Sequence, residues 1–232
     1  MRIRVYLFIG KIYIKKTVLK SWKNEKGIDM AKENITTILF DLGGVVFELG
    51  GIQTVCDWSR ERLSSEHLLQ RWLESPAVRA FESGRIEYPQ FREQLKVELG
   101  LAVEDDEYDR TFTAWIRGIY PGAAELLGEL NQKYTVACFS NTNVVHWEIL
   151  MTDYNLPACF EKRFASFEMG LVKPDKEAFL YVLDALGQPP ETVVFLDDSP
   201  ANVSAASDCG LNAVCVKGID GARQVLSKMG LI

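Results

Sequence analysis

The chain has 232 residues, of which 47% are hydrophobic, 25% charged and 11% aromatic. These values are typical of a globular protein with a full-sized core, and they exclude a disordered chain, a collagen-like rod and a small disulfide scaffold. The net charge is -6, from 26 basic and 32 acidic residues. Because this balance gives no electrostatic attraction to a phosphate backbone, we expect no nucleic-acid partner.

The N-terminal segment differs in charge from the rest of the chain. Residues 1–29 have a net charge of +6, which leaves -12 for residues 30–232. The apolar stretch in this segment ends at Lys11, before it reaches signal-peptide length, and no window approaches the ~18 apolar residues of a membrane-spanning helix. We expect residues 1–33 to be a disordered extension or the product of an upstream start codon, with a weak membrane-surface anchor as the alternative. The protein is therefore expected to be cytoplasmic, without a membrane partner.

Four short apolar runs predict buried strands, at residues 36–40, 134–139, 192–196 and 213–216. The runs are continuous rather than alternating, which is the pattern of a parallel sheet covered on both faces. Apolar residues at helical spacing predict one helix that ends at Gly187. A second helix is expected to begin near Pro200, a residue favoured in the first helical turn, and to stop at Gly210. This alternation predicts an α/β fold, a doubly wound Rossmann-like parallel sheet formed by residues 34–47 and 118–232.

Residues 48–117 show a different pattern. Leucine and aromatic residues recur there at helical spacing among many charges, without a convincing strand run. We expect a small helical domain inserted after the first strand.

Polar side chains follow three of the predicted strands: Asp41 after the first, Ser140 and Asn141 after the second, Asp197 and Asp198 after the third. Ligands of open α/β sheets bind at the carboxyl ends of the strands, so these groups should converge. Carboxylates on strands ~4.8 Å apart repel each other unless a cation or a proton neutralises them. Oxygen ligands of this kind suit Mg²⁺.

Lys173 precedes Pro174, which favours an extended residue before it and a helix start after it. The lysine ammonium can then reach back over the sheet edge. Taken singly, each of these polar residues also has a structural interpretation, because an Asp at a strand end is more often a turn or cap residue. Ser140 or Asn143 could likewise cap the helix that follows.

Four segments, taken in order, resemble the four motifs of the haloacid dehalogenase-like hydrolase superfamily: Phe-Asp41-Leu-Gly43-Gly-Val, Phe-Ser140-Asn-Thr-Asn, Gly-Leu-Val-Lys173-Pro-Asp and Phe-Leu-Asp197-Asp198-Ser-Pro-Ala-Asn202. The resemblance runs from about residue 35 to the C-terminus, and the 48–117 insertion stands where the family has a helical cap. Phe81-Glu-Ser-Gly84-Arg resembles the cap segment of this family, and we expect the hinge between core and cap at Phe47-Glu48. The bacterial α-glucose-1-phosphate phosphatase-like group is the most similar.

This resemblance implies that Asp41 is a nucleophile that forms an aspartyl-phosphate. Ser140 and Asn141 would bind the substrate, and Lys173 would offset the negative charge of the phosphoryl group and of Asp41. The implied activity is that of a Mg²⁺-dependent phosphatase, which hydrolyses a small phosphorylated metabolite such as a sugar phosphate. We expect a monomer or a homodimer.

The resemblance also implies the magnesium ligands. Asp41, the backbone carbonyl of Gly43 and Asp197 would hold Mg²⁺, with Asp198 and Asn202 in supporting positions.

Gly43 departs from the pattern of most superfamily phosphatases, which have there a second Asp that protonates the leaving oxygen and later activates water. Loss of such a group costs ~10²–10⁴ in rate. The glucose-phosphatase-like group also has Gly there, so activity is still expected, with a preference for acidic leaving groups such as those of anomeric sugar phosphates. Two alternatives stay open: a haloacid dehalogenase, which needs no Mg²⁺, and a catalytically weak regulatory protein that binds phosphometabolites.

Overall fold

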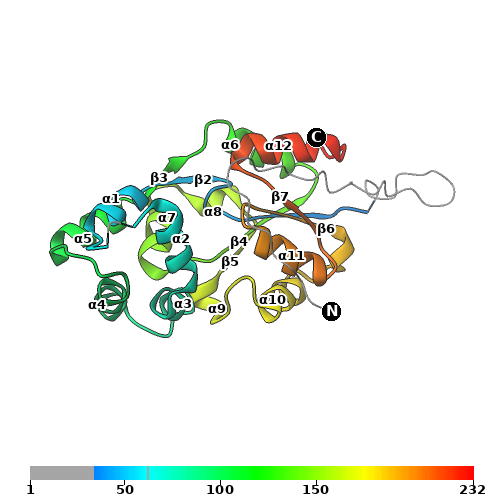
Figure 1. Cartoon of the computed structure of the whole chain (residues 1–232). Coiled ribbons are helices and arrows are strands. Elements are labelled where there is room, and N and C mark those ends of the chain that lie inside the picture. The colour runs from blue at the N-terminus through cyan, green and yellow to red at the C-terminus, as the bar shows by residue number, and fades with distance from the viewer. Residues whose placement is uncertain (1–33, 62) are drawn as a thin grey trace, which may run out of the picture.

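The computed structural model describes residues 34–61 and 63–232, so the expected extension at residues 1–33 lies outside the described residues. Its centre is a five-stranded parallel sheet in the order β5-β4-β1-β6-β7 (Figure 1). The strands are β1 (Thr37–Phe40), β4 (Thr135–Ser140), β5 (Lys162–Ala165), β6 (Val193–Asp197) and β7 (Asn212–Cys215). The predicted α/β class and parallel sheet are confirmed.

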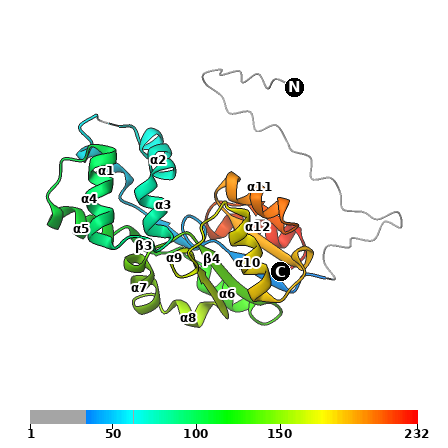
Figure 2. The ribbon, with the colours of Figure 1, turned by 90° about the horizontal axis from the view of Figure 1, so that it is seen from below.

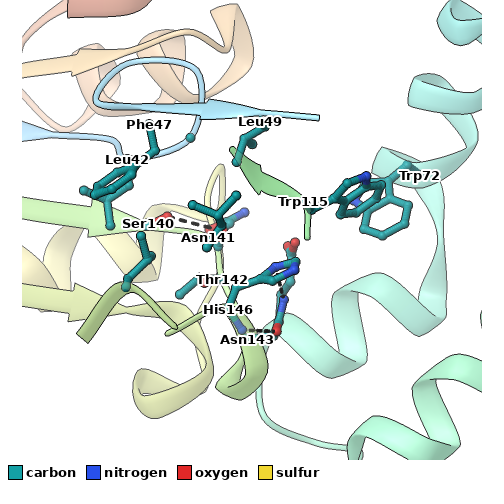
Figure 3. Close-up of a pocket in the computed structure, with 14 residues that line it drawn as sticks. Leu42, Phe47, Leu49, Trp72, Trp115, Ser140, Asn141, Thr142, Asn143 and His146 are labelled. Carbon is teal, nitrogen blue, oxygen red and sulfur yellow. Dashed lines mark hydrogen bonds between the residues drawn. The ribbon is translucent and has the colours of Figure 1, made fainter. Parts of the chain in front are cut away.

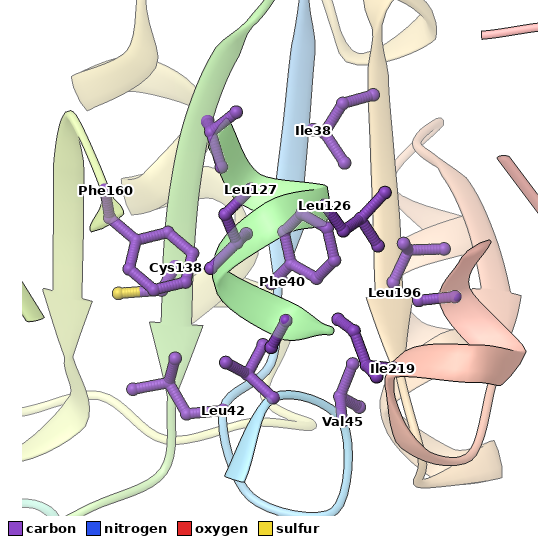
Figure 4. Packing of buried hydrophobic residues seen from close by; sticks show 14 of the residues in the cluster. Ile38, Phe40, Leu42, Val45, Leu126, Leu127, Cys138, Phe160, Leu196 and Ile219 are labelled. Carbon is purple, nitrogen blue, oxygen red and sulfur yellow. The ribbon is translucent and has the colours of Figure 1, made fainter. Parts of the chain in front are cut away.

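Both faces of the sheet are buried, which explains why the strands are continuous apolar runs. Ile38 and Phe40 pack into one core, and Leu39 packs into the core on the opposite face. Helices α6 (Ala123–Leu130) and α12 (Gly218–Lys228) cover the first face, as Figure 4 shows around Leu126 and Ile219. Helices α10 (Lys176–Leu186) and α11 (Pro200–Asp208) cover the second face.

The ends of these helices follow the local signals in the sequence. Helix α10 ends at Gly187, whose φ of 67° is the left-handed conformation that favours glycine, and α11 begins with Pro200. The remaining short elements on the sheet side are α7 (Val144–Thr152), α8 (Leu156–Cys159), α9 (Ser166–Met169) and the 3-10 turn Pro190–Thr192.

Five helices lie in the chain between β2 (Phe47–Leu49) and β3 (Ile116–Ile119), which pair as an antiparallel ribbon. They are α1 (Ile52–Trp58), α2 (Ser65–Glu74), α3 (Pro76–Glu82), α4 (Tyr88–Leu99) and α5 (Asp105–Thr113), here called the helical insertion. Figure 2 shows them gathered beside the sheet, and they have a hydrophobic core of their own. The sequence pattern did not predict the β2–β3 ribbon, and the proposed hinge at Phe47-Glu48 falls on β2.

The edge strand β5 was also missing from the sequence prediction. Lys162 and Arg163 are half-exposed and interrupt the apolar run that marks the other strands.

In the part of the chain that the structure describes, no helix combines the length and the apolar character needed to cross a bilayer.

Candidate active site

The sheet register brings Asp41 and Asp197 to the same edge. Phe40 is paired with Leu196 on the neighbouring strand, and the backbone N–H of Asp41 donates to the Leu196 carbonyl at 2.8 Å. Asp198 follows directly, and one carboxylate oxygen from each of these three acids lies within 4.8 Å of the other two. The convergence that the sequence predicted is therefore present in the structure.

Lys173 lies at the centre of this acidic cluster. Its Nζ donates to Asp41 Oδ1 at 2.8 Å, to Asp197 Oδ2 at 2.6 Å and to the Phe139 carbonyl at 2.9 Å. The side chain is 1% exposed. Burial alone would lower the pKa of the ammonium, but the two carboxylates outweigh this effect and raise the pKa of Lys173 above its ordinary value. The lysine is therefore charged, and it offsets one of the two buried acids it contacts.

The cluster keeps an excess of negative charge. Burial raises the pKa of Asp41 to about 7, Lys173 opposes this effect, and Asp197 adds to it. Burial and the charge of Asp197 also raise the pKa of Asp198. Three acids around one ammonium therefore favour binding of a further cation.

The donors at this position fit Mg²⁺. The acidic groups offer oxygen atoms only, which is the ligand type that Mg²⁺ prefers. The backbone carbonyl of Gly43 lies in the turn after β1, and within the described residues no backbone N–H outside regular elements donates to it. This carbonyl lies two residues after Asp41 in the chain, and its lack of such a backbone donor is consistent with the predicted ligand.

Neighbouring residues position two of the acids, Asp197 and Asp198. Asp197 Oδ1 accepts from the backbone N–H of Ser199 at 2.8 Å and from Asn202 Nδ2 at 3.0 Å. Gly44 has a φ of 72°, and a Cβ at this position would overlap with the Asp198 carboxylate. Asn202 therefore contacts Asp197, which is one of the predicted metal ligands, and Gly44 lets Asp198 approach the turn.

Asn141 contacts the Lys173 segment, and its expected contact with the substrate stays a prediction. Its Oδ1 accepts from the backbone N–H of Lys173, and its Nδ2 donates to the Lys173 carbonyl, both at 2.8 Å. This pair of hydrogen bonds holds the lysine segment against the end of β4. The buried Ser140 hydroxyl, by contrast, has only a long contact of 3.4 Å, to the Asn141 carbonyl.

A cavity of about 130 Å³ opens in front of Ser140, between the sheet and the helical insertion. Its walls come from the segment after β4, which carries Asn143 and His146, and from the insertion side, which supplies Trp72, Glu82 and Trp115. Figure 3 shows Ser140 and Asn141 on one side of this space and the two tryptophans on the other. A second cavity of about 370 Å³ continues past Trp72 and Trp115.

His146 links the two parts of the cavity wall. Its Nε2 lies 2.7 Å from the Phe112 carbonyl, and its Nδ1 lies 3.2 Å from Asn143 Nδ2. Since a carbonyl can only accept, we assign the ring proton to Nε2. Burial lowers the pKa of His146, so the ring is neutral. Asn143 caps α7, because its Oδ1 accepts from the backbone N–H of His146, as the structural interpretation of this residue allowed.

Glu82 is the cavity residue with a carboxyl group, and sequence reasoning did not single it out. The side chain is half-buried at the C-terminal end of α3. Burial raises the pKa of Glu82 to about 8, Lys173 opposes the effect and Asp41 adds to it. The signal available in the sequence was its place in the segment Phe81-Glu-Ser-Gly84-Arg.

Comparison with known proteins gives a flavin mononucleotide hydrolase, a D-ribitol-5-phosphate phosphatase and (S)-2-haloacid dehalogenases among the curated relatives. Flavin mononucleotide hydrolase 1 of Arabidopsis thaliana is 32% identical over 111 residues, which cover 47% of this chain and 45% of that protein. D-ribitol-5-phosphate phosphatase of Bacteroides thetaiotaomicron is 23% identical over 183 residues, which cover 76% of this chain and 89% of that protein.

A solved structure is also similar. It is a haloacid dehalogenase family enzyme of Bacteroides thetaiotaomicron in complex with magnesium and inorganic phosphate. It has a TM-score of 0.65 and 27% identity, over 79% of this chain and 94% of that one. The family model of haloacid dehalogenase-like hydrolases matches residues 35–210, and the chain belongs to this family.

Proposed function

We propose that this hydrolase is a Mg²⁺-dependent phosphatase that acts on a small phosphorylated metabolite through a phosphorylated Asp41. The observation that carries the proposal is the buried contact of Lys173 with both Asp41 and Asp197, next to Ser140 at the carboxyl ends of the strands. The D-ribitol-5-phosphate phosphatase and the flavin mononucleotide hydrolase among the relatives support it, as does the magnesium and phosphate complex of the similar structure.

Asp41 is the proposed nucleophile. Lys173 contacts its Oδ1, and Oδ2 attacks phosphorus. A bond from Asp41 to phosphorus forms while the bond from phosphorus to the leaving oxygen breaks, and water then hydrolyses the aspartyl-phosphate. Lys173 and the Ser140 hydroxyl bind the phosphoryl oxygens and stabilise the charge that develops on them. Asn141 acts here by holding the Lys173 backbone.

Asp41, Asp197 and the Gly43 carbonyl would hold the metal ion. When bound, Mg²⁺ supplies positive charge that offsets these acids and the phosphoryl group. Asn202 fixes the orientation of Asp197, and Asp198 adds negative charge from a supporting position.

The cavity favours an uncharged leaving group that carries hydroxyls. None of the described residues that line it is a Lys or an Arg, and His146 is neutral. The Glu82 carboxyl can exchange hydrogen bonds with hydroxyls, and Trp72 and Trp115 offer aromatic faces. These features support a sugar or polyol phosphate as the substrate.

The helical insertion acts as a cap in this proposal, with residues 48–117 as its bounds and the hinge at Phe47-Glu48. A closed cap excludes water and selects the leaving group. The cytoplasmic location and the monomeric or homodimeric state expected from the sequence stay predictions.

The test is phosphate release from a panel of sugar, polyol and acid phosphates, with Mg²⁺ or with EDTA. We expect turnover of uncharged sugar or polyol phosphates, loss of turnover in EDTA, and loss in Asp41→Asn. Asp208→Asn, which changes an exposed acid at the end of α11, is the control and should keep full activity. Binding of these esters without turnover under every condition would refute the proposal and favour the regulatory alternative.

The dehalogenase alternative has support from the dehalogenases among the relatives. Its chemistry also uses an Asp nucleophile, but needs no Mg²⁺ and gives no reason for the acidic pair Asp197-Asp198. Halide release from a 2-haloacid in the presence of EDTA would establish this alternative instead.

A further inference from the structure

We propose that Glu82, supplied by the helical insertion, is the general acid and base of this phosphatase and takes the role that Gly43 cannot perform. This inference rests on the proposed function, because it assigns a group to the same reaction.

Residue 43, where most family phosphatases have the second Asp, lacks a side chain, and Leu49 leaves little room for one. Gly43 has no side chain, and a Cβ built there would lie 2.7 Å from Leu49 Cδ1. The end of the Leu49 side chain, which extends from β2, therefore lies where a side chain at residue 43 would begin. A proton donor for the leaving group must come from another wall of the cavity.

The cavity offers two titratable side chains among its described residues, Glu82 and His146. His146 is not available, because Nε2 donates to the Phe112 carbonyl and Nδ1 accepts from Asn143. The Glu82 carboxyl, by contrast, makes no side-chain hydrogen bond among the described residues, and it lines the cavity. Glu82 is therefore the group that can exchange a proton with a molecule in the cavity.

Two contacts fix Glu82 close to the sheet, although it belongs to the insertion. Gly84 has a φ of 66°, and a Cβ there would overlap with the backbone carbonyl of Phe167 in α9. One turn earlier on α3, Arg79 forms an ion pair with Asp175, the residue that precedes α10. Both contacts dock α3 on the core side, and they place Glu82 where the charges of Lys173 and Asp41 influence it.

The protonation state of Glu82 agrees with this role. Burial raises its pKa to about 8, so the carboxyl carries a proton near neutral pH, as a general acid must.

The proposed steps balance in atoms and protons. As Asp41 attacks phosphorus and the bond to the leaving oxygen breaks, the Glu82 carboxyl gives its proton to that oxygen, and a neutral alcohol leaves. The Glu82 carboxylate then takes a proton from water as the water oxygen bonds to phosphorus and the Asp41–phosphorus bond breaks. Inorganic phosphate leaves, and Glu82 is protonated again for the next cycle.

The role changes the substrate preference expected from Gly43 alone. With a proton donor in the cavity, alkyl phosphates, whose leaving alkoxides are strongly basic, need not be slower than anomeric sugar phosphates. The preference for acidic leaving groups should instead appear when Glu82 is replaced.

The experiment compares two substrates in wild type and in Glu82→Gln. For an alkyl phosphate such as a polyol phosphate we expect kcat/KM to fall by ~10²–10⁴-fold. For 4-nitrophenyl phosphate, whose leaving phenolate is stable without a proton, kcat/KM should fall much less. A lower kcat for both substrates, with a burst of nitrophenol, would report slow hydrolysis of the aspartyl-phosphate. Glu87→Gln, five residues along the same insertion and exposed, should leave both values unchanged.

An equal loss of kcat/KM for the two substrates, or no loss, overturns the role of Glu82. The ratio of kcat/KM for the alkyl phosphate to kcat/KM for 4-nitrophenyl phosphate tests the role of Glu82 even if the variant folds poorly. A smaller active fraction lowers both values of kcat/KM equally and leaves their ratio unchanged. Wild type that releases no phosphate from any ester defeats the proposed function itself, which is a different result.

Discussion

Lys173 Nζ lies 2.8 Å from Asp41 Oδ1, although the two residues are 132 positions apart in the sequence. The same nitrogen lies 2.6 Å from Asp197 Oδ2, so one ammonium joins the ends of two strands. Because all three side chains are buried, the contact contributes to the stability of the sheet edge as well as to the chemistry of the site.

Replacing Lys173 with Met therefore should affect both properties. The variant leaves two buried acids without their cation, which typically costs about 3–5 kcal/mol. We expect a free energy of unfolding lower by this amount in urea titrations at neutral pH, and phosphate release lower by about 10²-fold or more. Lys176→Met, an exposed lysine at the start of α10, is the matched control. A Lys173→Met protein with unchanged stability would show that the buried contact is not formed in solution.

The metal-free protein should lose stability as pH rises from about 4 to about 8. Asp41 and Glu82 have pKa values of about 7 and about 8, raised by burial, so in this window the folded state binds protons more tightly than the unfolded state. For each pH unit in which one of these carboxyls is protonated only in the folded state, the free energy of unfolding falls by about 1.4 kcal/mol. Urea titrations in EDTA at several pH values measure the slope.

Two comparisons isolate this effect. His146, whose pKa is lowered by burial, contributes the opposite slope below about pH 6.5, because protonation favours the unfolded state there. The slope is therefore taken as the difference between wild type and the double variant Asp41→Asn/Glu82→Gln, which should lack it. Added Mg²⁺ should restore stability at the high-pH end, because it binds the deprotonated acids of the folded state. Parallel curves for wild type and the double variant would contradict the prediction.

Part of the site could be predicted from the sequence because parallel strands fix which residues meet. Asp41, Ser140 and Asp197 each end or follow a buried strand, and the pairing of Phe40 with Leu196 then determines that the acids are neighbours. The same local logic applies to Lys173, which precedes the start of a helix.

Glu82 and Asn141 show why the rest could not be predicted. The position of Glu82 depends on how α3 docks against α9 and α10, through a carbonyl contact and an ion pair that no local pattern encodes. The partner of Asn141 depends on the path of the Lys173 backbone, 32 positions away. Both relationships are set by tertiary packing rather than by periodicity or by a strand end.

The close approach of Gly84 to Phe167 predicts a loss of activity in Gly84→Ala. The added Cβ would overlap with the Phe167 carbonyl, so α3 must move away from α9 and carry Glu82 with it. A misplacement of about 1 Å costs up to about 10²-fold in rate, and we expect a fall of this order in kcat/KM for alkyl phosphates.

Gly100→Ala is the matched control for this variant. Gly100 belongs to the same insertion and has a similar φ of 60°, but a Cβ there meets no atom within 4 Å. The backbone strain is thus comparable, and only the contact with Phe167 differs. Equal activities of the two variants would indicate that the docking of α3 does not position a catalytic group.

An acid at residue 43 should compensate for the loss of Glu82. Leu49 is 55% exposed, so its truncation to Ala opens space next to Gly43 at little cost in stability. In a Glu82→Gln/Leu49→Ala background, Gly43→Asp places a carboxyl beside the nucleophile, and we expect kcat/KM for an alkyl phosphate to recover by about tenfold or more. Gly43→Asn in the same background has nearly the same shape but cannot act as an acid, so it should give no recovery. With Glu82 intact, the new Asp should add little, because the leaving oxygen already receives a proton. If Asp and Asn at residue 43 give the same kcat/KM, the missing function of the Glu82→Gln protein is not proton transfer.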